Sequence, residues 1–242
     1  MTVQVDIKAL FEAGVHFGHK TSRWHPKMAP YIHSKRQGSH IIDLTKTVEA
    51  LGRALPFLTK VAATGKPILF VGTKKQAKAI AKAAAEQSGM PYVTERWIGG
   101  MLTNVATTNA QVKKLKDLER RMASGDLEKR YNKLEVQRFQ EEIDSLNLKY
   151  GGIKNMNGRP AALVVFDVLT DANAINEARN LNIPVVGIVD TNADPSRVEY
   201  PIPGNDDAIK SIQLLLSYFT KAAAEGAGAV KKEDKSVKRG DK

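Results

Sequence analysis

The stretch Lys66-Pro67-Ile68-Leu69-Phe70-Val71-Gly72 decides the fold, because it is a short apolar run with a proline at its entrance and a glycine at its end. Such a run is typical of a strand that is buried on both faces of a sheet. Similar runs follow at residues 161–166 and 184–189, and helical patterns lie at residues 74–87, at 171–180 and from about 205. Strands that alternate with helices predict crossover connections, and therefore a parallel sheet with helices on both faces.

Residues 104–155 interrupt this alternation with two apolar stripes. The second stripe has the spacing of a coiled-coil seam and consists of Val136, Phe139, Ile143, Leu146 and Tyr150. The first stripe consists of Val112, Leu115, Leu118 and Met122. A turn fits between them at Ser124-Gly125-Asp126. The pattern predicts an antiparallel coiled-coil hairpin that is inserted into the sheet domain, with two ordinary core helices as the alternative.

We therefore divide the chain into three parts. Residues 1–103 and 156–224 form an α/β core domain with a basic N-terminal extension, and residues 104–155 form the inserted hairpin. Residues 225–242 are rich first in Gly and Ala and then in Lys and Asp. Because this last part lacks an apolar period, we expect a disordered basic tail.

The net charge of +11 comes from 37 basic and 26 acidic side chains and indicates a polyanionic partner. Residues 1–103 hold 15 basic and 6 acidic side chains, whereas residues 156–224 hold 5 and 8, and this asymmetry predicts one defined basic face. The absence of cysteine excludes disulfides, zinc fingers and thiol nucleophiles. Because the first residues lack a signal-peptide pattern and no run approaches the ~18 apolar residues of a membrane span, we expect a soluble cytoplasmic protein.

Residues 13–42 contain no acidic side chain. They hold five cations, all five histidines of the chain and one tryptophan: Lys20, Arg23, Lys27, Lys35, Arg36, His16, His19, His25, His33, His40 and Trp24. Cations neutralise phosphates, while Trp and His stack on bases or sugars, so this mixture favours an RNA surface. The histidine spacings match no familiar metal-ligand pattern, and a purely structural role for most of these histidines is the alternative.

A second cluster is Glu95-Arg96-Trp97-Ile98-Gly99-Gly100-Met101-Leu102-Thr103-Asn104. Paired glycines let the backbone approach a partner closely, and Arg96 beside Trp97 offers a charged plane and a stacking plane. The alternative is a tight turn with Trp97 in the core. Lys74 and Lys75 lie at a predicted helix N-terminus, where backbone N–H groups already favour an anion such as a phosphate.

An enzymatic interpretation depends on carboxylates. Asp167 and Asp190 each follow a predicted strand, and Asp206 and Asp207 open the last helix. Because strand C-ends and helix N-ends share one edge of a doubly wound sheet, these side chains can converge and, with His19, hold a divalent ion. The alternative is that they cap turns and complement a helix dipole. The chain lacks the two common nucleotide-binding glycine loops and the serine elbow of hydrolases, which argues against an enzyme.

Five stretches are long and ordered enough to be compared with known families. They are Ala13-Gly14-Val15-His16-Phe17-Gly18-His19-Lys20, Arg23-Trp24-His25-Pro26-Lys27-Met28, Arg96-Trp97-Ile98-Gly99-Gly100-Met101-Leu102-Thr103-Asn104, Val189-Asp190-Thr191-Asn192-Ala193-Asp194-Pro195 and Tyr200-Pro201-Ile202-Pro203-Gly204-Asn205-Asp206-Asp207-Ala208-Ile209. Together they resemble bacterial small-subunit ribosomal protein two over about residues 5–224. His25, where asparagine is usual, and Gln37 and Ser39, in a loop that is typically basic, depart from the family's pattern.

The resemblance implies a flavodoxin-like doubly wound sheet with a coiled-coil hairpin, and a structural, non-catalytic constituent of the small ribosomal subunit. It implies contact with small-subunit rRNA near the head–body junction and with neighbouring ribosomal proteins. It also implies a part in seating the mRNA-binding ribosomal protein one. We expect neither a membrane partner nor a homo-oligomer.

These considerations select the candidate site residues. We expect RNA contacts at Lys20, Arg23, Trp24, Lys27, Lys35, Arg36, Lys74, Lys75, Arg96, Asn104, Lys113 and Lys114. We expect no required cofactor, and we keep open a structural divalent ion at His19, Asp190 and Asp206. Two alternatives remain: a metal-dependent phosphate or nucleotide enzyme that uses Asp167, Asp190 and Asp206, and an adaptor that binds proteins through the hairpin and the carboxylate edge.

Overall fold

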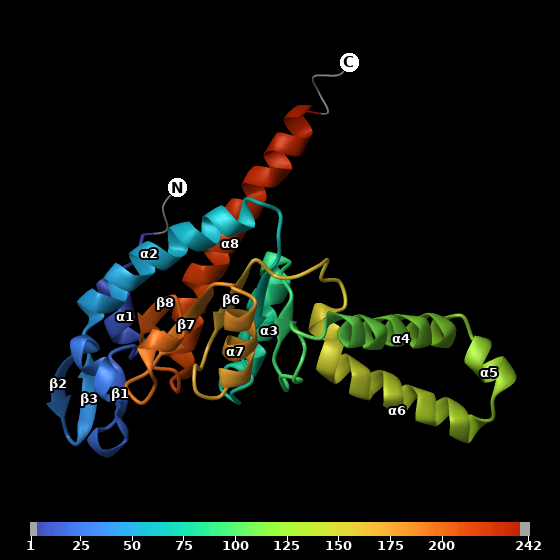
Figure 1. Cartoon of the computed structure of the whole chain (residues 1–242), viewed down its shortest axis with the longest axis horizontal. Helices are drawn as coiled ribbons and strands as arrows, with labels where there is room; N and C mark the ends of the chain where they lie inside the picture. Colours follow the sequence, from blue (N-terminus) through green and yellow to red (C-terminus); the bar gives the residue numbers. More distant parts are fainter. Residues whose placement is uncertain (1–3, 238–242) are drawn as a thin grey trace.

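The computed structural model describes residues 4–237 and contains a parallel sheet of five strands (Figure 1). The strands are β4 (Ile68–Val71), β5 (Tyr92–Val93), β6 (Ala162–Val165), β7 (Val185–Val189) and β8 (Tyr200–Pro203). They lie in the order β5-β4-β6-β7-β8. Numbered from β4, this is the order 2-1-3-4-5 that doubly wound sheets of the flavodoxin type have. The predicted α/β class with a parallel sheet is confirmed.

The two faces of the sheet are covered by different elements. On one face pack α2 (Leu44–Ala62), α3 (Lys78–Ser88) and α8 (Ile209–Val237), and on the other pack α7 (Ala172–Asn180) and the base of the hairpin. The side chains of β4 alternate between these faces, because Ile68 and Phe70 are buried on the first and Leu69 and Val71 on the second. The strand is therefore buried on both faces, as its unbroken apolar run predicts.

A helical hairpin projects from the body of the molecule (Figure 1). It consists of α4 (Val105–Ala123), α6 (Lys133–Tyr150) and, at the tip, a short α5 (Asp126–Arg130) where the sequence predicts only a turn. In the predicted seam of α6, Ile143 and Tyr150 are buried, whereas Val136 and Phe139 nearer the tip are more accessible. The two long helices therefore pack more closely at the base than at the tip, and coiled-coil interlocking of their side chains stays a prediction.

The N-terminal segment forms a second sheet, which the sequence pattern does not predict. Its strands β1 (Phe17–Lys20), β2 (Ile32–Arg36) and β3 (Ser39–Ile42) are antiparallel and lie in the order β1-β3-β2. Helix α1 (Ile7–Glu12) precedes the sheet, and the 3-10 helices η1 (Thr21–Arg23) and η2 (Pro26–Tyr31) connect β1 to β2. We call β1, η1, η2, β2 and β3 together the N-terminal sheet.

Close backbone approach attaches the N-terminal sheet to the main sheet. A side chain at Gly18 has no room, since its Cβ would lie 2.5 Å from Cγ2 of Thr191, just beyond β7. The backbone N–H of His19 donates to Oγ1 of the same threonine at 2.9 Å. Strand β1, and with it the N-terminal sheet, is therefore fixed beside the carboxyl end of β7.

Helix α8 is longer than the sequence predicts. We expected disorder from residue 225, but α8 continues to Val237, and residues 238–242 lie outside the described part of the chain. At the start of this extension a Cβ at Gly226 would lie 2.3 Å from the carbonyl oxygen of Thr59, so the small residue lets α8 pack closely on α2 at that point. None of the helices within residues 4–237 combines the length and the apolarity that crossing a membrane requires.

Candidate nucleic-acid interface

The N-terminal sheet presents a group of unpaired cations. Lys20, Arg23, Lys35 and Arg36 are exposed, and within residues 4–237 none of these four forms an ion pair. Strand β2 lies at an edge of its sheet, and all its residues from His33 onward are exposed. Like charges that gather on one small surface without counter-ions from the chain create a positive potential that attracts a polyanion.

Trp24 and Lys27, in the same part of the molecule, differ in whether an external partner can use them. Trp24 is 38% exposed, and its ring centroid lies 5.2 Å from that of His40. Lys27 is already paired, because its Nζ lies 2.8 Å from Oδ2 of Asp194 and donates to Oγ of Ser196 at 2.8 Å. Burial raises the pKa of Asp194, but the hydrogen bonds from Lys27 and Ser196 outweigh burial and hold this pKa well below its usual range. Trp24 thus offers a stacking face, whereas the charge of Lys27 is largely offset.

The five histidines do not form one site. His16 lies between two phenylalanine rings at centroid distances of 4.4 and 4.1 Å, and the Nδ1 of His25 caps the start of η2. His40 is 1% exposed and neither ring nitrogen has a hydrogen-bond partner among residues 4–237, while His33 is exposed. Burial lowers the pKa of His16 and of His40, so both rings are neutral at pH 7. Within the described residues, His19 is the histidine whose ring nitrogens lie within ion-pair distance of carboxylates.

The glycine-containing loop of residues 97–104 binds a carboxylate of the chain itself. Glu177 of α7 accepts hydrogen bonds from Trp97 Nε1, from the backbone N–H groups of Gly100, Leu102 and Thr103, and from Thr103 Oγ1, at 2.7–3.1 Å. Burial raises the pKa of Glu177, but these hydrogen bonds outweigh burial and lower it. Successive N–H groups that point at one anion form a nest. Of the paired glycines, Gly100 therefore serves an internal contact, whereas Gly99 is exposed, and the approach of an external partner to this loop stays a prediction.

The remaining candidates near the hairpin lie in different environments. Trp97 is 8% exposed, as the core interpretation predicts, whereas Arg96 is exposed. Asn104 caps the first turn of α4 through its side-chain oxygen. Lys113 and Lys114 are both exposed on α4, and Lys114 pairs with a glutamate of α6. The hairpin therefore adds cations that a polyanion can reach.

The cations of the N-terminal sheet and those of the hairpin do not lie on one face of the molecule. The N-terminal sheet and the hairpin lie at opposite ends of the long axis of the molecule, with the main sheet between them (Figure 1). Lys75 is exposed at the C-terminal edge of the main sheet. The basic face predicted for residues 1–103 is therefore separate from the cations of the hairpin, because the main sheet lies between them (Figure 1).

Lys74 is not free to meet an external phosphate. Its Nζ lies 2.6 Å from Asp207 Oδ1, 2.7 Å from Asp206 Oδ1 and 3.4 Å from Asp167 Oδ2. Burial lowers the pKa of Lys74, but the hydrogen bonds to Asp206 and Asp207 outweigh burial and raise it. The pKa of Asp206 is nevertheless raised by burial and by the nearby charges of Asp190 and Asp167, since one ammonium does not neutralise so many carboxylates. We call Lys74 with Asp167, Asp190, Asp206 and Asp207 the carboxylate cluster.

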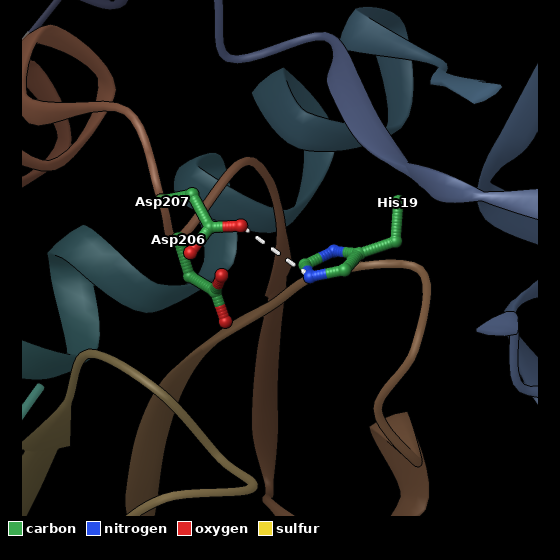
Figure 2. Close-up of side chains that lie close together, drawn as sticks. All are labelled: His19, Asp206 and Asp207. Atoms are coloured by element: carbon green, nitrogen blue, oxygen red, sulfur yellow. Dashed lines mark ion pairs between the residues drawn. The ribbon is translucent and has the colours of Figure 1, made fainter.

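His19 of β1 joins this cluster from the N-terminal sheet. Figure 2 shows its ring facing Asp207 and Asp206, and the Nε2 lies 3.4 Å from Asp207 Oδ2. On its other side Nδ1 lies 3.2 Å from Asp190 Oδ2. The pKa of His19 is raised, first by the hydrogen bond to Asp190, although burial opposes the shift. Of the predicted ion ligands, the structure brings His19 and Asp206 together with Asp207, and places Asp190 directly against the imidazole.

The crevice where this topology usually holds a ligand is filled by the chain's own side chains. In a sheet of order 2-1-3-4-5 the crevice lies between the carboxyl ends of β4 and β6. Here Thr73, after β4, donates through its N–H and Oγ1 to Asp171 at 3.2 and 2.7 Å. Burial raises the pKa of Asp171 to about 6. Asp167, after β6, accepts hydrogen bonds from Leu169 and Thr170 in its own turn. The geometry is that of a closed structural network.

Sequence reasoning missed one residue of these networks and gave another too small a part. Asp207 is predicted to converge with the other carboxylates but is not among the predicted ion ligands, although it contacts both Lys74 and His19. Glu177 carried no signal, because it is one of several polar residues on an ordinary amphipathic helix. Its partners lie more than 70 positions earlier in the chain, and a local pattern contains no information about them.

Comparison with known proteins gives a consistent result. A family model described as ribosomal protein S2 matches residues 10–226. Small ribosomal subunit protein uS2 of Thermus thermophilus is 48% identical over 230 residues, which cover 95% of this chain and 90% of the relative. The protein of the same name from Maridesulfovibrio salexigens is 47% identical over 233 residues, which cover 96% of this chain and 89% of the relative.

Proposed function

This chain belongs to the ribosomal protein S2 family, and on this premise we propose that it is a structural constituent of the small ribosomal subunit that binds small-subunit rRNA. The family is structural and non-enzymatic. The closed crevice between β4 and β6 is consistent with that assignment, since Lys74, Thr73 and the aspartates there already contact one another. The proposal therefore concerns a surface that binds, and not a site that reacts.

The observation that carries the RNA proposal is the set of exposed, unpaired cations on the N-terminal sheet. Lys20, Arg23, Lys35 and Arg36 lie there beside the partly exposed ring of Trp24. Cations bind the phosphates of RNA, and an aromatic ring stacks on an unpaired base. Lys75, Arg96 and Lys113 extend the proposed contact to the edge of the main sheet and to the hairpin. The predicted contacts of Lys27, Lys74, Lys114 and Asn104 become secondary, because their polar groups already have partners.

We place the protein, with its family, near the head–body junction of the subunit and in the cytoplasm, as a single copy among neighbouring ribosomal proteins. We also propose that it helps to seat ribosomal protein one. Phe17, which is 52% exposed, lines the same surface hollow as the half-exposed carboxylate of Asp207, and an exposed ring beside an acid suits a protein segment better than a phosphate. Failure of the wild-type protein to retain purified ribosomal protein one would contradict the seating role, and equal retention by a Phe17→Ala variant would contradict the part that this surface plays in it.

A structural divalent ion beside His19 remains a proposal. One nitrogen and two carboxylate oxygens, from His19, Asp206 and Asp207, lie within 4.8 Å of one another, and zinc accepts such ligands. Two features oppose tight binding: the Lys74 ammonium already contacts both aspartates, and a raised pKa favours the protonated imidazole. No cofactor is required for the proposed RNA role. Calorimetric titration of the metal-free protein with zinc chloride tests the ion, and an absence of heat would refute it.

The RNA proposal predicts a steep dependence of binding on salt. Each neutralised phosphate contributes a slope of about 0.7–0.9 in a plot of log affinity against log salt. Replacement of Lys20, Arg23, Lys35 and Arg36 together by glutamine is expected to lower the slope for small-subunit rRNA by about 3, and the affinity at physiological salt by roughly tenfold or more. Filter binding over a range of potassium chloride concentrations measures both quantities.

A matched control replaces four lysines at other positions, Lys60, Lys66, Lys82 and Lys221, and changes the net charge by the same amount. We expect this variant to keep most of the slope. Equal losses in the two variants would mean that the attraction depends on net charge alone, and a salt-independent affinity of the wild-type protein would remove the basis of the proposal.

A further inference from the structure

Glu177 occupies an unusual position at the base of the hairpin. It is a side chain of α7, which packs on the main sheet, yet its carboxylate binds the loop that leads from β5 into α4. Both of its oxygens are used, since Oε1 accepts from Trp97 Nε1 and Gly100 N, and Oε2 accepts from Leu102 N and from Thr103 N and Oγ1. One carboxylate thus satisfies five donors of a single loop.

Apolar burial and this carboxylate together attach the loop to the core. Its apolar residues Trp97, Met101 and Leu102 are buried on the same face of the sheet as α7. Gly100 has a positive φ of +85°, which glycine adopts readily, and its N–H donates to the carboxylate. Directly after the loop, Asn104 begins α4. Because the helix starts where the bound loop ends, its direction depends on the orientation of this loop.

Because the hairpin is long, a small change of its angle at the base moves its tip by a large distance. Helix α4 has 19 residues and is therefore about 28 Å long at ~1.5 Å per residue. A rotation of roughly 10° at its base would move the tip by about 5 Å at that length. The hairpin and the N-terminal sheet lie at opposite ends of the molecule (Figure 1). A rigid RNA surface can meet both only if the base is held at one angle.

We propose that Glu177 is a positioning residue that fixes the angle of the hairpin, so that the cations of the hairpin and those of the N-terminal sheet engage one RNA surface at the same time. This role rests on the proposed rRNA binding. Two sites that are held in a matching geometry bind with a high effective concentration of the second site after the first has bound. Loss of the fixed angle lowers that effective concentration without removing any cation from either site.

The hairpin angle can be measured directly because the chain contains no cysteine. Spin labels on Ser124→Cys at the tip and Gln87→Cys on α3, both exposed, report one distance in double electron–electron resonance. We expect a narrow distance distribution for the otherwise wild-type protein and a broader or shifted one when Glu177→Gln is added. An unchanged distribution in the Glu177→Gln protein would overturn the proposal.

A matched control has the same chemistry elsewhere. Glu199 accepts a hydrogen bond from the backbone N–H of Val185 at 2.8 Å, away from the hairpin. Glu199→Gln therefore removes the same charge and also weakens a carboxylate–amide contact, and we expect it to leave the distance distribution unchanged. A broadened distribution in this control as well would show general loosening of the fold and would count against a specific role of Glu177.

Binding to small-subunit rRNA separates positioning from a merely structural role. We expect Glu177→Gln to weaken binding by about tenfold and Glu199→Gln to leave it unchanged or slightly tighter. In a Lys113→Gln/Lys114→Gln background, which lacks two of the hairpin's cations, Glu177→Gln is expected to cost less, whereas full additivity would contradict the proposal. If the wild-type protein itself fails to bind rRNA, the proposed function fails, and the spin-label distances still decide whether Glu177 sets the angle.

Discussion

The N-terminal sheet and the carboxylate cluster lie side by side and meet at strand β1. Most cations of the sheet are unpaired within residues 4–237, whereas the cation of the cluster is paired. Lys20 at the end of β1 is exposed and unpaired within residues 4–237, while His19 beside it turns toward Asp190 and Asp207. Lys74, which the sequence placed among the RNA-binding cations, is held by three carboxylates. The same residue type thus stabilises the fold in one region and stays available to a partner in the other.

This difference shows how the cations of the N-terminal sheet avoid pairing with the acidic side chains nearby. Part of the acidic charge beside the N-terminal sheet has a counter-ion from the chain itself, because Lys74 and His19 contact the carboxylate cluster and Lys27 pairs with Asp194. Unpaired carboxylates beside the sheet would weaken its attraction for a polyanion. The separation of paired and unpaired charge is therefore part of the binding surface, and substitutions in either region test it.

The largest effect, a loss of free energy of unfolding, is expected when the ion pairs of the carboxylate cluster are broken. Lys74→Met leaves Asp167, Asp206 and Asp207 without their cation, and removing one partner from a buried ionic cluster costs about 3–5 kcal/mol of the free energy of unfolding. Urea denaturation at pH 7 measures the change. The exposed neighbour provides the control, because Lys75→Met is expected to stay within about 0.5 kcal/mol of the wild type. A loss of less than about 1 kcal/mol for Lys74→Met would show that the cluster is not a stabilising network.

A smaller effect, on the affinity for RNA, is expected when the N-terminal sheet loses a stacking ring but keeps all its cations. Trp24→Ala removes the partly exposed ring, and the stacking of one base on an aromatic side chain contributes about 1–3 kcal/mol. We expect the affinity for small-subunit rRNA to fall roughly 5- to 150-fold while the salt slope stays the same, since no cation is lost. A fall in the slope with unchanged unfolding free energy would mean that the tryptophan positions the cations and does not stack.

The smallest effect, again on the free energy of unfolding, is expected at His19, which joins the N-terminal sheet to the carboxylate cluster. The pKa of His19 is raised in the folded protein, so its contribution to stability is present below its unfolded pKa of about 6.5 and is lost as pH rises through the higher folded value. His19→Gln is therefore expected to destabilise the protein by less than about 1 kcal/mol near pH 6 and by progressively less at alkaline pH. Unfolding curves at a series of pH values measure this trend, and the opposite trend would contradict the assigned ion pairs.

Several features of the fold could be predicted because they depend on neighbours in the chain. The unbroken apolar run at residues 68–71 predicts a strand buried on both faces, and each face of the sheet indeed covers two of its side chains. The stripe that includes Ile143 and Tyr150 predicts a helix that packs through one side, and those residues are buried in α6. Hydrophobic periodicity reports which side chains leave water, and this is a local property.

The amino-acid sequence by itself determined the α/β class, the inserted helical hairpin and the presence of cations in residues 13–42. Only the tertiary structure decided which cations are free, because Lys74 meets Asp206 across 132 positions of chain and Glu177 meets Gly100 across 77. It also placed the two groups of cations at opposite ends of the molecule (Figure 1). A charge acts through space with a strength set by distance and burial, and chain order alone specifies neither of these quantities.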